Sequence, residues 1–248
     1  VQMAQPACHT RLMTTADRTS ASVALIGVPT DVGAGKRGAS MGPEALRVAG
    51  IDKALSRLGR GVIDRGNVTG PRNPENPRCG EYRHLPEVAA WCRGVHDAVF
   101  ESLTAGEIPL TMGGDHSAAI GSVAAVARYC AERDRPLAML WLDAHADFNV
   151  ASSSPSGNIH GMPVSVMAGH GPPELVGLAG FQPMLPANRI VQIGIRSVDA
   201  SEKELVVESG MVVYDMRRID ELRMRTVMEQ ALAHVAERDV HLHVSFDV

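Results

Sequence analysis

The feature that most constrains this chain is a short segment of acidic residues and histidine that directly follows an apolar run. Residues 137–142 read Leu-Ala-Met-Leu-Trp-Leu, which is typical of a buried strand, and the chain continues Asp-Ala-His-Ala-Asp. Side chains two positions apart point to the same face of an extended backbone. We therefore expect Asp143, His145 and Asp147 to converge on one side of a strand end, where they can bind a metal ion.

Two other apolar segments also end in side chains that bind metals. Residues 108–112 run into Gly-Gly-Asp-His-Ser, which offers His116, and residues 244–248 offer Asp247. An open α/β sheet gathers its ligands at the carboxyl ends of its strands. We predict one cluster, formed by His116, Asp143, His145, Asp147 and Asp247.

The number and type of these side chains favour two metal ions over one. A single ion is saturated by about four such groups, whereas a carboxylate can bridge two ions about 3.5–4 Å apart. A carboxylate-rich set favours Mn²⁺ over metals that prefer sulfur, although the general affinity order favours Zn²⁺. Two ions that share one water lower its pKa, which is hydrolase chemistry.

The remaining pattern is an alternation of strands and helices, which indicates a parallel sheet with helices on both faces. A Gly-x-Gly-x-x-Gly motif at residues 33–38 raises the alternative of a dinucleotide fold, but the next helix is expected to begin only at Pro43. His241 and His243 share the Asp247 face, and we interpret them as packed strand histidines. The predicted strands are 23–29, 61–64, 190–195 and 211–214, and the predicted helices are 91–104, 118–132 and 224–236.

In this order, the motifs Gly-Gly-Asp-His-Ser, Asp-Ala-His-Ala-Asp and Ser-Phe-Asp-Val resemble the three metal motifs of the ureohydrolases. These are binuclear manganese enzymes that include arginase and agmatinase. The segments 156–165 and 193–199 resemble further arginase segments, so the resemblance is closest to arginase and covers nearly the whole chain. It implies a three-layer α/β/α fold with a mostly parallel central sheet, two Mn²⁺ ions and a homo-oligomer of three or six copies.

The resemblance also implies a role for each metal ligand. His116 and Asp147 would hold one manganese ion, and His145 would hold the other. Asp143 and Asp247 would bridge both ions. Asp147 would in addition accept a hydrogen bond from the bridging hydroxide.

The resemblance further implies that His160 acts as a proton shuttle. An imidazole titrates near neutrality, so it can protonate a departing amine and exchange protons with bulk water. The alternative is a histidine in a glycine-rich loop that satisfies a nearby carbonyl.

The loop between the second metal motif and His160 would select the substrate. L-Arginine has an α-carboxylate and agmatine has none, so an arginase needs hydrogen-bond donors, which Asn149, Ser154 and Ser156 supply at matching spacing. The resemblance assigns the α-ammonium to Asp199 and, more indirectly, Glu202; the alternative for these two is a turn and a helix cap. These residues favour hydrolysis of L-arginine to L-ornithine and urea over hydrolysis of agmatine or another guanidino compound. A third alternative is an inactive metal-binding fragment.

Composition excludes several other classes. With 248 residues, of which 45% are hydrophobic, the chain fits one α/β domain over residues 21–248, preceded by a disordered tail over residues 1–20. The net charge of −4 gives no reason to expect nucleic acid or an anionic membrane as a partner. No run approaches the roughly 18 apolar residues of a membrane span. The four cysteines are scattered, which is typical of reduced thiols in a cytoplasmic protein.

The end of the chain departs from the ureohydrolase pattern. The third metal motif of that family reads Ser-Phe-Asp-x-Asp, whereas this sequence stops at Val248, before the second Asp. A later Glu that holds the guanidinium group and the last strand of the sheet would also be missing. We therefore expect negligible arginase activity from the 248-residue chain and activity from a longer parent protein.

Overall fold

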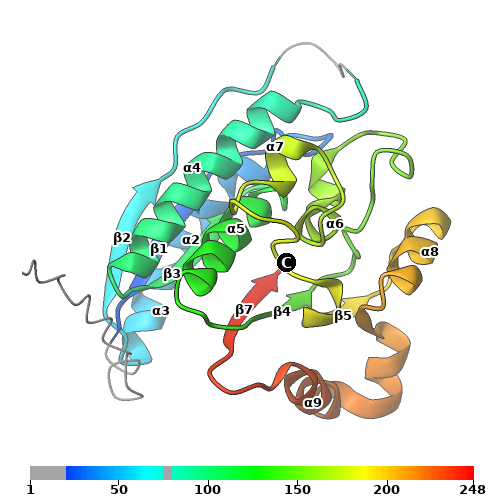
Figure 1. Cartoon of the computed structure of the whole chain (residues 1–248). Coiled ribbons are helices and arrows are strands. Elements are labelled where there is room, and N and C mark those ends of the chain that lie inside the picture. The colour runs from blue at the N-terminus through cyan, green and yellow to red at the C-terminus, as the bar shows by residue number, and fades with distance from the viewer. Residues whose placement is uncertain (1–20, 75–79) are drawn as a thin grey trace, which may run out of the picture.

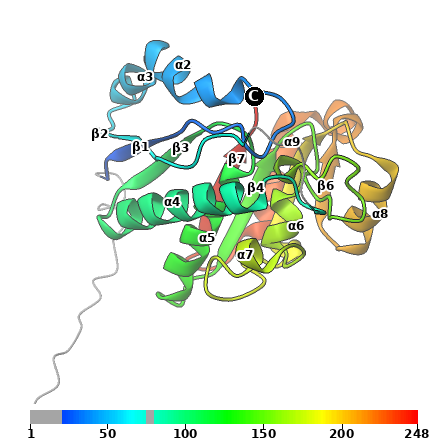
Figure 2. The same ribbon diagram turned by 90° about the horizontal axis from the view of Figure 1, so that it is seen from above.

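The computed structural model describes residues 21–74 and 80–248, so the predicted tail at residues 1–20 lies outside the described residues. Parallel strands form a central layer, with α4 to α7 on one side and α2, α3 and α9 on the other (Figures 1 and 2). The elements are β1 (Val23–Val28), η1 (Ala39–Met41), α2 (Gly42–Val48), α3 (Ile51–Arg57), β2 (Val62–Asn67), α4 (Leu85–Thr104), β3 (Ile108–Gly113), α5 (Ala118–Ala131), β4 (Leu137–Leu142), η2 (Ile159–Gly161), α6 (Pro163–Met167), α7 (Pro173–Val176), η3 (Ala187–Arg189), β5 (Ile190–Ile195), α8 (Ala200–Glu208), β6 (Val212–Asp215), α9 (Met216–Val235) and β7 (His241–Phe246).

The described strands form two sheets, and every pair in them is parallel. The order is β2-β1-β3 in one sheet and β6-β5-β4-β7 in the other. The predicted three-layer α/β/α class is confirmed. The central layer, however, is not one continuous sheet. In the described residues β3 and β7 are edge strands of the two sheets and do not pair with each other.

Strand β4 shows why its sequence is apolar throughout. Leu137, Met139 and Trp141 are buried in the larger core, which α4 and α5 also line. Ala138 and Leu140 point to the opposite face, where α9 packs against them. A parallel strand covered by helices on both faces needs apolar side chains at every position. Full burial of one large side chain stabilises the fold by about 1.5–3 kcal/mol.

Helix boundaries differ from those expected at two places. Helix α4 begins at Leu85 rather than near Trp91, with a proline in its first turn. Helix α9 begins at Met216, but Arg223 interrupts it with φ 67° and ψ 147°. The predicted helix over residues 224–236 corresponds to the part after this kink. Helices α3, α6 and α7 were not predicted, because they have at most seven residues and show little periodicity. Helix α8 corresponds to the helix that the alternative for Asp199 and Glu202, a turn and a helix cap, implies.

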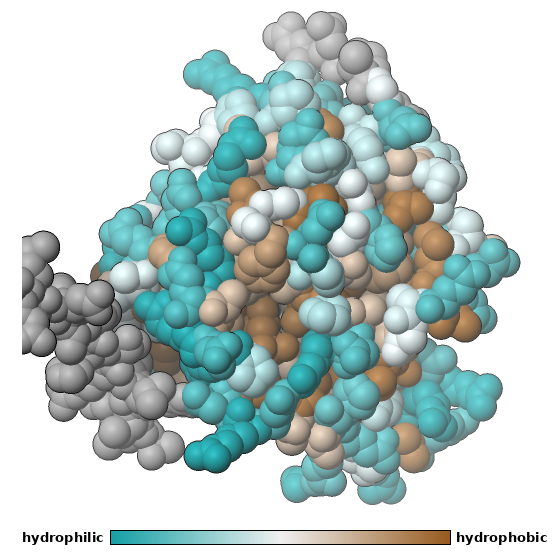
Figure 3. Space-filling view, viewed as in Figure 1, coloured by the Kyte–Doolittle hydropathy of each residue, from teal (hydrophilic) through white to brown (hydrophobic). Residues whose placement is uncertain are grey.

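The surface is mixed in character. On the face shown in Figure 3, hydrophobic residues reach the surface near the middle and along the right-hand edge, and hydrophilic residues cover much of the rest. None of the helices in residues 21–74 and 80–248 combines the length and apolar character needed to cross a bilayer.

Gly121 provides a test of the packing between α4 and α5. A Cβ atom there would lie 2.3 Å from the Cys92 carbonyl oxygen and 2.9 Å from the Val95 Cβ. In an open helix, Gly→Ala stabilises by about 1 kcal/mol. We expect Gly121→Ala instead to lower the free energy of unfolding by about 1–3 kcal/mol, measured by urea denaturation.

Gly161→Ala is the matched control, since a Cβ at that position meets no atom within 4 Å. Its effect on the free energy of unfolding should stay within about 0.5 kcal/mol. A stabilising Gly121→Ala would show that the helices are not packed closely at this crossing.

Candidate metal centre

Three strand ends bring predicted metal ligands together. His116 lies three residues after β3, and Asp143 and Asp247 directly follow β4 and β7. One ligand atom from each of these residues lies within 4.8 Å of the others. The β4 and β7 ends are neighbours in the sheet, because Leu142 pairs with Phe246.

The Nδ1 atom of His116 is surrounded by carboxylates. It lies 3.1 Å from Asp143 Oδ2, 3.2 Å from Asp147 Oδ2 and 3.6 Å from Asp247 Oδ2. His116 Nδ1 and Asp143 Oδ2 are nevertheless buried without a hydrogen-bond partner of suitable geometry in the described residues. Buried polar atoms are normally satisfied, so this pair fits a site for a cation.

Two contacts fix the ring of His116 in this orientation. Its Nε2 atom lies 2.9 Å from Ser245 Oγ, and its ring stacks on Trp141 with a centroid distance of 4.1 Å and an angle of 13°. Hydrogen bonding of the second ring nitrogen orients a histidine ligand and sets its tautomer. Ser245 was not predicted as a site residue, although it lies two positions before Asp247 and side chains at this spacing share one face of an extended backbone.

His145 lies on the other side of Asp143. Its Nδ1 atom is 3.5 Å from Asp143 Oδ1, and its side chain is 58% exposed. Asp143 thus presents one oxygen to His116 and the other to His145. A carboxylate placed between two imidazoles is suited to bridge two ions.

The expected reason for the convergence of these side chains is wrong. Strand β4 ends at Leu142, and the following residues bend instead of continuing as a strand. The His145 N–H donates to Asp143 Oδ1 at 2.8 Å, and Asp147 has φ 48°. Asp143 and Asp147 approach His116 because the backbone turns, so the two-residue period does not explain their positions.

The pKa values reflect how costly it is to bury these charges. Burial raises the pKa of Asp147. Burial also acts to raise the pKa of Asp143, but its contacts with His116 and His145 together outweigh burial and lower the pKa. In His116, burial acts to lower the pKa, but the two carboxylates outweigh burial and raise it to about 9. Bound cations would stabilise the carboxylates in place of this proton.

The predicted proton shuttle and carboxylate-binding residues lie in the loop that follows. The His160 N–H donates to the Gly33 carbonyl at 3.1 Å, and the His160 side chain interacts electrostatically with Asp147. Asn149 Oδ1 accepts from Ser153 Oγ at 2.8 Å, so the Asn149 amide nitrogen remains to donate.

The two serine hydroxyls of this loop lie side by side. Ser154 Oγ is 3.4 Å from Ser156 Oγ. They accept backbone N–H groups, Ser154 from Gly157 at 3.1 Å and Ser156 from Asn158 at 3.2 Å. A hydroxyl whose oxygen accepts from the backbone can turn its own O–H toward an anion.

Asp199 and Glu202 occupy different environments. Asp199 is the exposed N-cap residue of α8, without a capping hydrogen bond from its side chain. Glu202 is buried, and its Oε1 accepts from the Phe148 N–H at 2.8 Å. Burial raises the pKa of Glu202. Glu202 therefore holds the backbone between Asp147 and Asn149.

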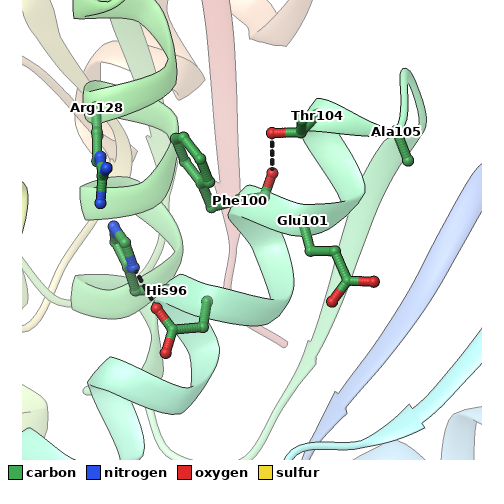
Figure 4. A pocket seen from close by; sticks show the side chains of 7 residues that line it. His96, Phe100, Glu101, Thr104, Ala105 and Arg128 are labelled. Carbon is green, nitrogen blue, oxygen red and sulfur yellow. Dashed lines mark hydrogen bonds and ion pairs between the residues drawn. The ribbon is translucent and has the colours of Figure 1, made fainter.

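A separate hollow lies outside this centre. It lies between α4 and α5 and is lined by His96, Phe100 and Arg128, among others (Figure 4). His96 Nδ1 already pairs with Asp97 Oδ1 at 2.9 Å. Asp97 and Glu101 also line the hollow, but they do not gather with His96 into a group of metal ligands like that of His116, Asp143 and Asp247 in the described residues.

Known proteins are similar to this chain in both sequence and fold. The family model described as "Arginase family" matches residues 21–248. The arginase of Brevibacillus brevis is 38% identical over 227 residues, covering 92% of this chain and 75% of the relative. The solved arginase structure from Bacillus caldovelox at pH 5.6 has a TM-score of 0.85 and 38% identity, covering 90% of this chain and 74% of that one. The Entamoeba histolytica arginase in complex with L-ornithine has a TM-score of 0.84 and 28% identity, covering 92% and 76%.

Asp143 lies at the middle of the cluster, so its removal tests the whole metal centre. We expect the full-length protein to bind two manganese ions and Asp143→Ala to lose most of both, because its two oxygens face different imidazoles. Elemental analysis after dialysis measures this. Asp97→Ala is the control, and it should keep the metal content of the parent. Equal metal in Asp143→Ala and the parent would disprove the cluster.

Proposed function

The chain belongs to the arginase family of hydrolases, and from this premise we propose that it hydrolyses L-arginine to L-ornithine and urea at a binuclear manganese centre. The observation that carries the proposal is the convergence of three carboxylates on His116 Nδ1. The family indicates attack on a C–N bond of an amidine. The donor-rich loop around Asn149 favours a substrate with an α-carboxylate.

The oxygen and imidazole ligands suit Mn²⁺. When bound, the two ions supply activation of a water and stabilise the charge that develops on the guanidinium group. His116 and Asp147 would hold one ion and His145 the other, with Asp143 and Asp247 shared between them.

Proton transfer is assigned to His160. Its side chain is half-buried and interacts electrostatically with Asp147, which suits a group that exchanges protons between the centre and the solvent. The imidazolium protonates the amine of ornithine as the C–N bond breaks, and the neutral ring then takes a proton from bulk water.

The loop residues orient the substrate. The amide nitrogen of Asn149 and the hydroxyls of Ser154 and Ser156 donate to the α-carboxylate, which is a charge-assisted interaction. Asp199 accepts from the α-ammonium group. Glu202 contributes indirectly, since it fixes the Phe148 backbone next to Asn149.

A cytoplasmic location and a homo-oligomer of three or six copies stay predictions from the sequence. The same holds for the absence of a nucleic-acid or membrane partner.

Urea release tests the function directly. The full-length protein, supplied with Mn²⁺, should show a kcat/KM for L-arginine at least about 100-fold above that for agmatine, since a site built to bind the carboxylate leaves donors unpaired without it. A chelator should remove the activity. Faster release from agmatine would contradict the choice of substrate, and a metal-loaded protein without turnover would contradict the function.

The Asn149→Ala and Ser156→Ala variants separate carboxylate binding from loop shape. A charge-assisted hydrogen bond contributes about 1.5–3 kcal/mol, so each variant should lose about 10- to 150-fold in kcat/KM for L-arginine. Turnover of agmatine, however slow, should change little. Ser152→Ala, an exposed serine of the same loop, should affect neither substrate. Equal losses for both substrates would mean that Asn149 and Ser156 only shape the loop.

A further inference from the structure

The glycine-rich segment at residues 33–38 has no assigned role in the proposed chemistry, yet a buried carboxylate binds its first residue. Asp115, 5% exposed, precedes the metal ligand His116. Its Oδ2 accepts from the Gly33 N–H at 2.9 Å. Its Oδ1 accepts from both the N–H and the hydroxyl of Ser117, at 3.0 and 2.5 Å. This carboxylate therefore ties the segment after β1 to the segment after β3.

The other side of Gly33 reaches the predicted proton shuttle. The Gly33 carbonyl accepts from the His160 N–H at 3.1 Å. Two successive hydrogen bonds thus connect Asp115, through a single residue, to the backbone of His160. A Cβ on Gly33 would lie 2.6 Å from Asp115 Oδ1 and Ser117 Oγ, so this approach requires glycine.

We infer that Asp115 is a positioning residue, which sets the place of His160 relative to His116 and hence to the metal centre. The inference rests on the proposed function, because that function gives His160 its part in proton transfer. Asp115 and His116 are adjacent in sequence, so the same short segment carries a metal ligand and, through Gly33, holds His160. A carboxylate suits this place because both of its oxygens face donors, and an amide would turn an N–H₂ group toward one of them.

Asp31 offers a matched comparison at the other end of the glycine-rich segment. It is also buried, and its Oδ2 accepts from the Gly38 N–H at 2.9 Å and from Ser40 Oγ at 3.0 Å. It holds the same segment by the same chemistry. In the described residues its carboxylate accepts hydrogen bonds from Gly38, Ser40 and Asn73, and from neither Gly33 nor His160.

The first test measures position without activity. In the full-length protein, residue-resolved amide hydrogen exchange should be at least about 10-fold faster at His160 in Asp115→Asn than in the parent. In Asp31→Asn the His160 amide should stay within about 3-fold of the parent. Unchanged exchange at His160 in Asp115→Asn would overturn the inference.

The second test is a double-mutant comparison of kcat. A misplacement near 1 Å can cost about 100-fold, so we expect Asp115→Asn to lower kcat by about 10- to 100-fold with the metal content unchanged. In a protein that already carries His160→Asn, adding Asp115→Asn should lower kcat by less than about a further 3-fold, because the effect of Asp115 passes through His160. The effect of Asp31→Asn should be the same in both backgrounds. Equal losses from Asp115→Asn in both backgrounds would show a general structural role instead.

These measurements distinguish failure of the proposed function from failure of the inference about Asp115. A parent protein that releases no urea refutes the proposed function, while amide exchange still decides whether Asp115 holds His160. If thermal unfolding shows that Asp115→Asn does not fold, Gly33→Ala disrupts the same contact from the other side and should raise exchange at His160 in the same way.

Discussion

Repulsion among buried carboxylates is the constraint on which the rest of the site depends. Asp143, Asp147 and Asp247 all approach one imidazole nitrogen, and the first two are buried. Removing such charges from water costs several kcal/mol each unless a counter-charge offsets it. One protonated imidazole supplies a single positive charge. Two divalent cations would supply four, and this balance would allow a folded protein to hold so many acids together.

The sheet holds these side chains in place through backbone contacts that extend past the strands. The Asp143 N–H donates to the Ile193 carbonyl at 3.1 Å, and the Asp247 N–H donates to the Leu142 carbonyl at 2.9 Å. Both ligands therefore keep the register of β4, β5 and β7. Trp141 is completely buried, and its ring stacks on the ring of His116. The buried core thus orients these ligand side chains through the sheet and through Trp141.

The sequence predicted those parts that follow from local rules. Asp143 and Asp247 were found because each directly follows an apolar strand, and the parallel fold then places them at one edge. Asp147 was selected for a reason that the structure contradicts, since its position depends on a turn at φ 48°. Contacts between segments far apart in the sequence could not be predicted. Glu202 bonds to Phe148 across 54 positions, and Asp115 bonds to Gly33 across 82, and neither pair leaves a periodic signal.

The glycine motif at residues 33–38 could not be interpreted from the sequence alone, but its contacts in the structure show which partner it binds. In a dinucleotide fold, such glycines let backbone N–H groups approach a phosphate. Here the N–H groups at both ends already bind carboxylates of the chain itself, Gly33 to Asp115 and Gly38 to Asp31. A phosphate would meet two buried negative charges at this place. The motif therefore specifies close approach to the backbone, and the surrounding charges decide that the partner is an internal acid.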